Sequence, residues 1–391
     1  MAIPEHDGNR GRPTGRVDRV AAFGAVVALA GCLLLPLLEF RPNRIVSGSP
    51  EPFGAAGAWG WFVLSACVVA LMASFMPRGR VRSPAVLALG GLLISALPWA
   101  LGAGAARLLD GVPEIARVSI GPGAWLVAVG GAILWFAGTR GVDTPLLRRG
   151  VLVAVILAAG AAGVWGGAGE LSLAREYAAQ SRRFWTLVNQ HLVLAGSGLA
   201  FGTLVGVPLG VYASRSRRVR QIGLGIVSVI QTIPSMAMLG LLITPLAALG
   251  VTAIGTTPAI IALTLYALLP IMRNTFVGLA GVDPGALDAG RGMGMGRTQL
   301  LLRVEAPLAL PLILEGIRAA AVLVIGIAAV TAFIGAGGLG ILVFQGWGQQ
   351  ADDLILLGAI PMVILAVLAD VSMRVLRRAV VSPGIEGGST P

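Results

Sequence analysis

Residues 308–334 read LALPLILEGIRAAAVLVIGIAAVTAFI, an apolar stretch that holds only two charged side chains, Glu315 and Arg318. An α-helix needs about 20 predominantly apolar residues to cross a bilayer, so this stretch predicts a membrane span. Similar stretches lie at about 20–38, 58–76, 85–105, 122–138, 151–168, 191–213, 221–243, 257–280 and 354–373. The sequence therefore predicts an all-α polytopic membrane protein with about ten transmembrane helices.

The composition supports a membrane protein and excludes some functions. Hydrophobic residues make up 56% of the 391 residues and charged residues only 12%, whereas soluble domains are roughly 25% charged. All 29 basic residues are arginine, and a P-loop needs a lysine that reaches the nucleotide phosphates. The chain is therefore not a standard P-loop ATPase. Its arginines lie in short clusters between apolar stretches rather than on one soluble face, so nucleic acid is not an expected partner.

The arginines also predict an orientation. If the N-terminus is cytoplasmic, the inner segments carry 21 arginines and the outer segments seven, as the positive-inside rule requires. We expect both termini in the cytoplasm and the chain in the cytoplasmic (inner) membrane. The predicted regions are a tail at 1–19, a five-span region at 20–168, an extracytoplasmic connector at 169–190, a core at 191–378 and a tail at 379–391.

No residues are placed for catalysis or for metal binding. Cys32 and Cys67 lie inside apolar stretches, as buried hydrophobic cysteines do. The two histidines, His6 and His191, belong to no recognisable catalytic motif. We therefore expect neither an enzyme nor a metal protein, and no cofactor bound by this chain.

Charged residues within the spans would be the usual sign of ion-coupled transport. Glu315 and Arg318 are three residues apart, so they can face each other, and Asp370 lies near the inner end of the last span. Structural pairing, or snorkelling of the charged groups to the cytoplasmic interface, explains them better than a proton relay at the middle of the membrane, which argues against an ion-coupled carrier.

Glycine occurs 56 times, and four glycines recur every four residues: Gly198, Gly202, Gly206 and Gly210. They form a smooth stripe on one helix face, which permits close packing of helices in lipid. The stripe could be static packing or a sliding surface. Glycines between Gly335 and Gly340 predict a tight re-entrant turn on the outer side.

A proline interrupts the apolar stretch at 221–243. Gln231, Thr232 and Ser235 lie beside Pro234, which removes one backbone donor and kinks a helix. Interrupted helices often line the substrate path of a transporter. The alternative is a kink with no role in the path, its backbone satisfied by Ser and Thr.

The predicted cytoplasmic loop at 281–307 contains a helix start. Asp283 is a candidate cap and Pro284 suits the first helical position. Glycines follow at Gly292, Gly294 and Gly296, and a second helix is expected near Arg297. Small residues on a short helix outside the membrane could dock another protein, or the loop could be a connector.

This loop resembles the EAA signature of ABC-importer permeases. Asp288, Ala289 and Gly290 fall where that family has Glu-Ala-Ala, and Gly294 falls on its glycine. Val304, Ala306 and Pro307 fall on its Ile-x-Leu-Pro. Asp for Glu, Gly for the second Ala and Ala for Leu depart from the signature, but the spacing is intact.

The resemblance covers about residues 185–380. This part of the chain is similar to the glycine betaine/carnitine/choline branch of these permeases, which implies a MetI-like permease core. The stretches that carry it are 231–235, 266–274, 332–340 and 358–361. It implies an osmoprotectant permease with a five-span N-terminal extension. It also implies that the EAA loop docks on a separate ATPase, with Asp288, Ala289, Gly290, Arg291, Gly294 and Pro307 as coupling residues.

The implied partners are ABC ATPase subunits that use ATP, an extracytoplasmic substrate-binding protein and a second, identical or different, permease chain. The translocation path would include Gln231, Thr232, Pro234 and Ser235. Two rivals stay open: a permease of the same architecture for amino acids or another small solute, and a stand-alone ion-coupled carrier.

Overall fold

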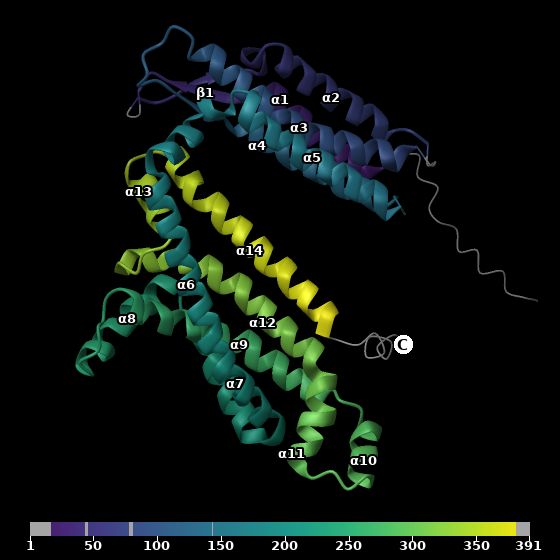
Figure 1. Ribbon diagram of the computed structural model, residues 1–391, viewed down its shortest axis with the longest axis vertical. Coiled ribbons are helices and arrows are strands. Elements are labelled where there is room, and N and C mark those ends of the chain that lie inside the picture. The colour runs from purple at the N-terminus through teal and green to yellow at the C-terminus, as the bar shows by residue number, and fades with distance from the viewer. Residues whose placement is uncertain (1–16, 44–45, 78–80, 143, 381–391) are drawn as a thin grey trace, which may run out of the picture. The chain divides into compact units, whose positions relative to one another are not determined.

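The computed structural model describes residues 17–43, 46–77, 81–142 and 144–380 (Figure 1). Two compact units divide the chain, Met1–Ala179 and Gln180–Pro391, and each is considered by itself as the N-terminal and the C-terminal unit. Residues 1–16 and 381–391, which make up most of the two predicted tails, lie outside the described residues.

Five apolar helices run through the described part of the N-terminal unit: α1 (Arg19–Leu34), α2 (Ala58–Ser74), α3 (Arg82–Leu108), α4 (Pro122–Thr139) and α5 (Pro145–Trp165). The Asp18 carboxylate caps α1 by accepting a hydrogen bond of 3.2 Å from the Ala21 N–H. Proline at the first turn suits the starts of α4 and α5, since the N–H it lacks would have no helical partner there.

Glycines bring α1 and α4 into close contact. A Cβ atom on Gly24 would lie 3.0 Å from the carbonyl oxygen of Gly130, and one on Gly31 would lie 2.8 Å from that of Gly123. Neither site has room for a larger residue without a shift of the backbone. Packing of small residues therefore holds this pair together, as is common in lipid.

A small antiparallel sheet joins three segments between the helices of the N-terminal unit. Its order is β2 (Ser49–Glu51), β1 (Leu38–Arg41) and β3 (Arg117–Ile120), and Leu38 pairs with both Glu51 and Ile120. Short 3₁₀ turns, η1 (Phe53–Ala56) and η2 (Ala168–Glu170), lie between helices. The sheet was not predicted, because its strands are too short to show an alternating pattern.

Helix α6 (Ser172–Arg215) begins within the predicted connector at 169–190 and leads into the C-terminal unit, with non-helical backbone at Gln180. The other elements of the described C-terminal unit follow in order. They are α7 (Arg217–Thr232), α8 (Ser235–Ala248), α9 (Thr256–Ala280), α10 (Pro284–Gly292), α11 (Arg297–Leu300), the π-helical turn η3 (Leu301–Glu305), α12 (Ala306–Ala328), η4 (Val330–Ile334), α13 (Gly340–Gly348) and α14 (Asp352–Val380).

Seven helices in the described chain are long and apolar enough to cross a membrane. They are α3, α4, α5, α6, α9, the continuous helix from Arg297 to Ala328, and α14. Helices α7 and α8 would make an eighth span if the bent pair is counted as one. Helices α1 and α2 are apolar but have only 16 and 17 residues. Each of the ten predicted stretches is largely helical, and the helical membrane fold is confirmed.

Helix α9 lies at the centre of the C-terminal unit, packed between α6 and α12 (Figure 1). All four glycines of the α6 stripe are buried against it. A Cβ on Gly198 or Gly202 would lie 2.5 Å from the Cβ of Leu263 or Ala267. The stripe is thus a packing surface in this structure.

The predicted tight turn is present between η4 and α13. Gly335, Gly337 and Gly338 have φ of 75°, 93° and 85°, which side chains with a Cβ rarely adopt. The side-chain oxygen of Gln190 on α6 accepts a hydrogen bond of 3.1 Å from the Gly338 N–H. This bond fixes the turn against α6.

Candidate functional site

The predicted docking loop forms a short helix, α10, at the end of the C-terminal unit opposite α13 (Figure 1). Asp283 caps it as predicted, by accepting a hydrogen bond of 3.2 Å from the Ala286 N–H, and Pro284 is in its first turn. Because the cap satisfies a free N–H and the proline ring fixes φ, these two residues determine where the helix starts.

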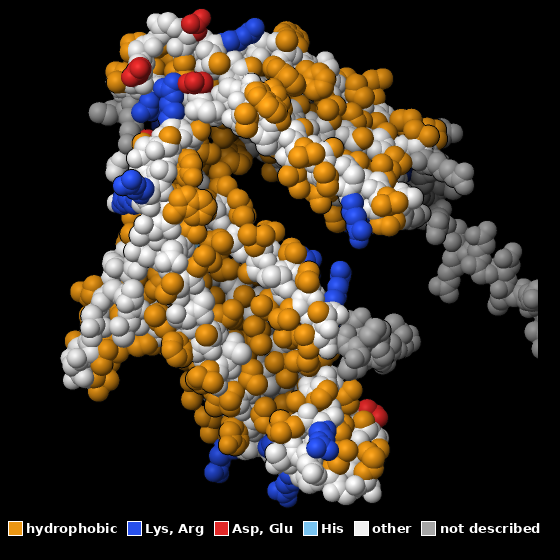
Figure 2. Space-filling view, in the orientation of Figure 1, with side chains coloured by type: hydrophobic (Ala, Val, Ile, Leu, Met, Phe, Trp, Pro, Cys, Tyr) orange, Lys and Arg blue, Asp and Glu red, His pale blue; other side chains and the backbone are white. Residues whose placement is uncertain are grey.

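The outward face of α10 carries three of the predicted coupling residues. Asp288, Ala289 and Arg291 are all exposed. The Asp288 carboxylate and the Arg291 guanidinium form an ion pair at 2.7 Å, with side chains 72% and 62% exposed. An exposed pair of this kind adds little stability, so both groups are free to interact with another protein. Figure 2 shows arginine side chains (blue) at this end of the unit and hydrophobic side chains over its membrane-spanning helices.

The two predicted coupling glycines have different surroundings. Gly290 is buried on the inner face of α10, where a Cβ would lie 2.6 Å from Cδ1 of Leu300 and 3.6 Å from Cγ2 of Val304. Gly294 is exposed with φ of 77°, and its N–H donates a hydrogen bond of 2.9 Å to the Arg291 carbonyl. One glycine permits close packing of the loop, and the other provides its left-handed turn.

Pro307 lies in the first turn of α12 and is exposed. The chain reaches it from α11 without a break in the helix, through the π-helical turn η3. The second short helix predicted near Arg297 is therefore the beginning of the long helix that contains α12. The Gln299 side chain accepts a hydrogen bond of 3.1 Å from the Gly296 N–H at its start.

Sequence reasoning missed an ion pair at this junction. Glu305, the last residue of η3, pairs with Arg215, the last residue of α6. The Glu305 side chain is only 3% exposed, and that of Arg215 is 50% exposed. The sequence offered one signal for this pair: Glu305 is a charged residue directly before the apolar stretch that begins at Ala306.

The predicted break at Pro234 separates α7 from α8, which are bent by 110°. The Gln231 amide donates a hydrogen bond of 2.9 Å to the Tyr266 carbonyl, and the Tyr266 hydroxyl donates one of 2.5 Å to the Ile233 carbonyl. Tyr266 on α9, to which sequence reasoning gave no role, thus bonds through its carbonyl and its hydroxyl to the end of α7, on the N-terminal side of the break.

The other residues predicted for the path lie at the same break. Thr232 and Pro234 are exposed, whereas Gln231 and Ser235 are half-buried. The Thr232 hydroxyl donates a hydrogen bond of 2.7 Å to the Val229 carbonyl, one turn earlier in α7. A backbone acceptor beside the kink is therefore satisfied within α7. Thr232 and Pro234 remain exposed in this chain.

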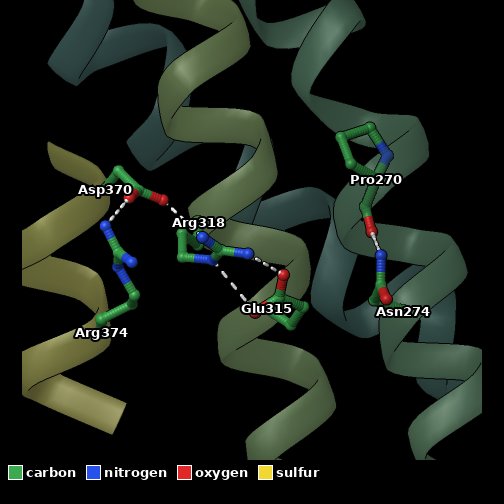
Figure 3. A network of polar contacts seen from close by, with 6 residues as sticks. All are labelled: Pro270, Asn274, Glu315, Arg318, Asp370 and Arg374. Carbon is green, nitrogen blue, oxygen red and sulfur yellow. Dashed lines mark hydrogen bonds and ion pairs between the residues drawn. The ribbon is translucent and has the colours of Figure 1, made fainter. Parts of the chain in front are cut away.

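The charged residues within the spans pair with one another, as the sequence predicted for Glu315 and Arg318 (Figure 3). Arg318 on α12 also pairs with Asp370 on α14, which in turn pairs with Arg374. The cluster contains two carboxylates and two guanidinium groups. Nearby on α9, the Asn274 side-chain amide donates a hydrogen bond of 2.8 Å to the carbonyl oxygen of Pro270, one turn earlier.

Among the described residues, no group of three or more histidine, cysteine, aspartate or glutamate side chains could hold a metal ion. Cys32 and Cys67 are both buried and unbonded to each other.

Comparison with known proteins finds two families. Residues 202–382 match the family described as "Binding-protein-dependent transport system inner membrane component". Residues 18–174 match "ABC transporter permease YehY, N-terminal domain". The two matches cover different halves of the chain.

Curated relatives resemble the C-terminal half. The carnitine transport permease protein OpuCB of Listeria monocytogenes is 47% identical over 47% of this chain and 82% of its own length. The glycine betaine/carnitine/choline permease OpuCB of Bacillus subtilis is 40% identical over 51% and 88%. The osmoprotectant import permease OsmW of Salmonella typhimurium is 42% identical over 51% and 93%. Among solved structures, one of the inward-facing MetNI methionine ABC transporter shares 26% identity with a TM-score of 0.47, over 51% of this chain and 96% of that one.

Proposed function

This chain belongs to the family of binding-protein-dependent transport system inner membrane components, the permeases of ABC importers, and on that premise we propose that it admits quaternary-amine osmoprotectants such as glycine betaine. The family makes it a non-catalytic, multi-pass component of the inner membrane. The observation that carries the proposed substrate is 40–47% identity to permeases named for carnitine, glycine betaine and choline, over most of their own lengths.

In this proposal α10 is the docking helix for an ATPase subunit that supplies the ATP hydrolysis. Asp288, Ala289 and Arg291 are exposed on a capped, short helix and are the contact residues. Gly290 and Gly294 act indirectly, since one is buried against Leu300 and the other shapes the turn. Pro307, exposed at the start of α12, marks where the loop joins a span.

The break between α7 and α8 is the proposed lining of the path. A bend of 110° exposes Thr232 and Pro234, and non-helical backbone within a span is stable only where it faces protein or water. An extracytoplasmic protein would deliver the solute, and an identical or different second permease chain would complete the path. Both partners are proposed from the family.

The test of substrate is uptake by the reconstituted complex with its ATPase and binding protein. Labelled glycine betaine should enter only with ATP, and excess carnitine or choline should compete whereas amino acids should not. Competition by amino acids alone would favour the amino-acid permease instead. Gradient-driven uptake by the isolated chain would contradict the proposal and support an ion-coupled carrier.

The test of docking is a pair of matched variants. Ala289 and Ala178 are both exposed alanines on helices, α10 and α6. Ala289→Trp should abolish co-purification of the ATPase, because the bulky ring prevents close approach to α10. Ala178→Trp should leave co-purification intact. If Ala289→Trp retains the ATPase in full, the docking assignment is wrong.

A further inference from the structure

The Glu305–Arg215 ion pair connects two distant parts of the chain, whose positions differ by 90 residues. A carboxylate with a side chain 3% exposed is costly to hold without a partner, and Arg215 is the partner that the structure gives it. Arg215 can keep part of its guanidinium in water, since its side chain is half exposed. The bond therefore fixes the end of η3 to the end of α6.

Glu305 belongs to an unusual turn. The five residues of η3 form a π-helix, a conformation that occurs mostly in single turns and often at functional sites. Its Val304 faces Gly290 on α10, where a Cβ would lie 3.6 Å from the valine Cγ2. Neighbouring residues of this turn thus contact α10 on one side, through Val304, and α6 on the other, through Glu305.

Helix α7 connects Arg215, at the end of α6, to the break at Pro234. After Arg215, the Ser216 hydroxyl caps α7 by accepting a hydrogen bond of 3.4 Å from the Val219 N–H. The Arg220 guanidinium lies 5.4 Å from the ring centroid of Phe276, which attaches α7 to α9. Helix α7 then ends at the break before Pro234.

We propose that Glu305 is a positioning residue for energy coupling: through Arg215, it transmits displacement of α10 to the α6–α7 junction and so to the break. The inference rests on the proposed function, since it takes α10 as the docking helix and the break as the path. It adds a residue that does not contact the ATPase or the solute. Without the ion pair, α10 can move while α6 and α7 stay in place.

The variants are chosen to separate coupling from folding. Glu305→Gln removes the charge and keeps the shape. The exchange of Glu305→Arg with Arg215→Glu restores an ion pair of reversed polarity. Arg218→Gln is the matched control, because it removes an exposed arginine three residues from Arg215 without touching the ion pair.

The main measurement is solute imported per ATP hydrolysed, in the reconstituted complex with its ATPase and binding protein. Glu305→Gln should keep co-purification of the ATPase and basal hydrolysis, while import per ATP falls about tenfold, within the usual range for coupling between two sites. The exchanged pair should recover at least half of the loss, and Arg218→Gln should match the unaltered protein.

A second measurement does not depend on activity. Spin labels at the exposed positions Met293, beyond α10, and Arg217, at the start of α7, report the distance between loop and junction. The distribution should be narrow in the unaltered complex, broad in Glu305→Gln and narrow again in the exchanged pair. This result would show that the ion pair positions the loop.

An unchanged ratio of import to hydrolysis in Glu305→Gln would overturn the proposal. So would a loss of assembly that the exchanged pair does not repair, since the glutamate side chain itself, and not the ion pair, would then be what the fold requires. The unaltered complex tests the proposed function, whereas this inference depends on differences between the variants and that complex. The two failures are therefore distinguishable.

Discussion

The Tyr266 hydroxyl donates a hydrogen bond of 2.5 Å to the carbonyl oxygen of Ile233, the residue at which α7 ends. The ring of Tyr266 is buried on α9, so its packing and its hydrogen bond can be tested separately. The Ile233 carbonyl lies at the C-terminal end of α7, where helical N–H partners run out, and such a group needs another donor in a membrane, where water is scarce.

Tyr266→Phe should keep the ring packed and leave the Ile233 carbonyl without this donor. Loss of a partner for a buried polar group costs about 1–3 kcal/mol. We expect the thermal midpoint of the purified complex to fall and the rate of uptake to fall with it. Thr264→Val, which removes a hydroxyl bonded only to the Ile260 carbonyl one turn earlier in the same helix, is the control and should have less effect. Equal results for both variants would show that Tyr266 does not hold the break.

Two glycines of α6 predict opposite effects of a glycine-to-alanine substitution on the stability of the chain. A Cβ on Gly202 would lie 2.5 Å from that of Ala267, so Gly202→Ala should destabilise the chain by about 1–3 kcal/mol through overpacking. Gly196 on the same helix has no neighbour within 4 Å, so Gly196→Ala should stabilise it by up to about 1 kcal/mol. Thermal unfolding of both variants in the same lipid checks the signs. Stabilisation by both would mean that α6 and α9 are not in close contact.

Arg318 is the residue on which the charged cluster depends, because it pairs with both Glu315 and Asp370. Arg318→Gln should destabilise the chain by about 1–3 kcal/mol, because the half-buried carboxylates of Glu315 and Asp370 lose a charged partner. The double variant with Glu315→Gln leaves the Asp370–Arg374 pair balanced and should recover part of the loss. The measurement is the yield of folded protein after heating. No recovery in the double variant would contradict the assignment of charge balance.

Two substitutions at Gly294 test whether the proposed docking depends on the shape of the loop. Its φ of 77° lies in the left-handed region, which asparagine tolerates and valine does not. Gly294→Asn should therefore retain co-purification of the ATPase. Gly294→Val should weaken it, since the strain of about 1–2 kcal/mol shifts the turn after α10. Equal retention in both variants would show that docking does not depend on this turn.

Local signals made part of the fold predictable. Asp283 and Pro284 determine the start of α10 through a side-chain cap and a fixed φ, both of which act within one turn of helix. Apolar length predicts the spans in the same way, since only the stretch itself is involved. The glycines from Gly335 to Gly338 likewise predict a turn, because few other residues adopt their backbone angles.

Contacts between distant segments could not be predicted from one sequence. Periodicity shows that Gly202 lies on a smooth face but not that Ala267 covers it. Nothing local distinguishes Gly290, buried against Leu300, from its exposed neighbour Ala289. The pairing of Glu305 with Arg215 depends on how α6 and η3 meet, and this is decided by the packing of the whole unit.

The cluster of Glu315, Arg318, Asp370 and Arg374 carries equal numbers of positive and negative groups, which has an electrical consequence. A single unpaired charge that crosses a membrane potential of 100 mV changes its energy by about 2.3 kcal/mol. A neutral cluster that moves as a unit does no net work against the voltage. A rearrangement of α12 and α14 that carries the cluster intact would therefore gain no voltage dependence from these four side chains.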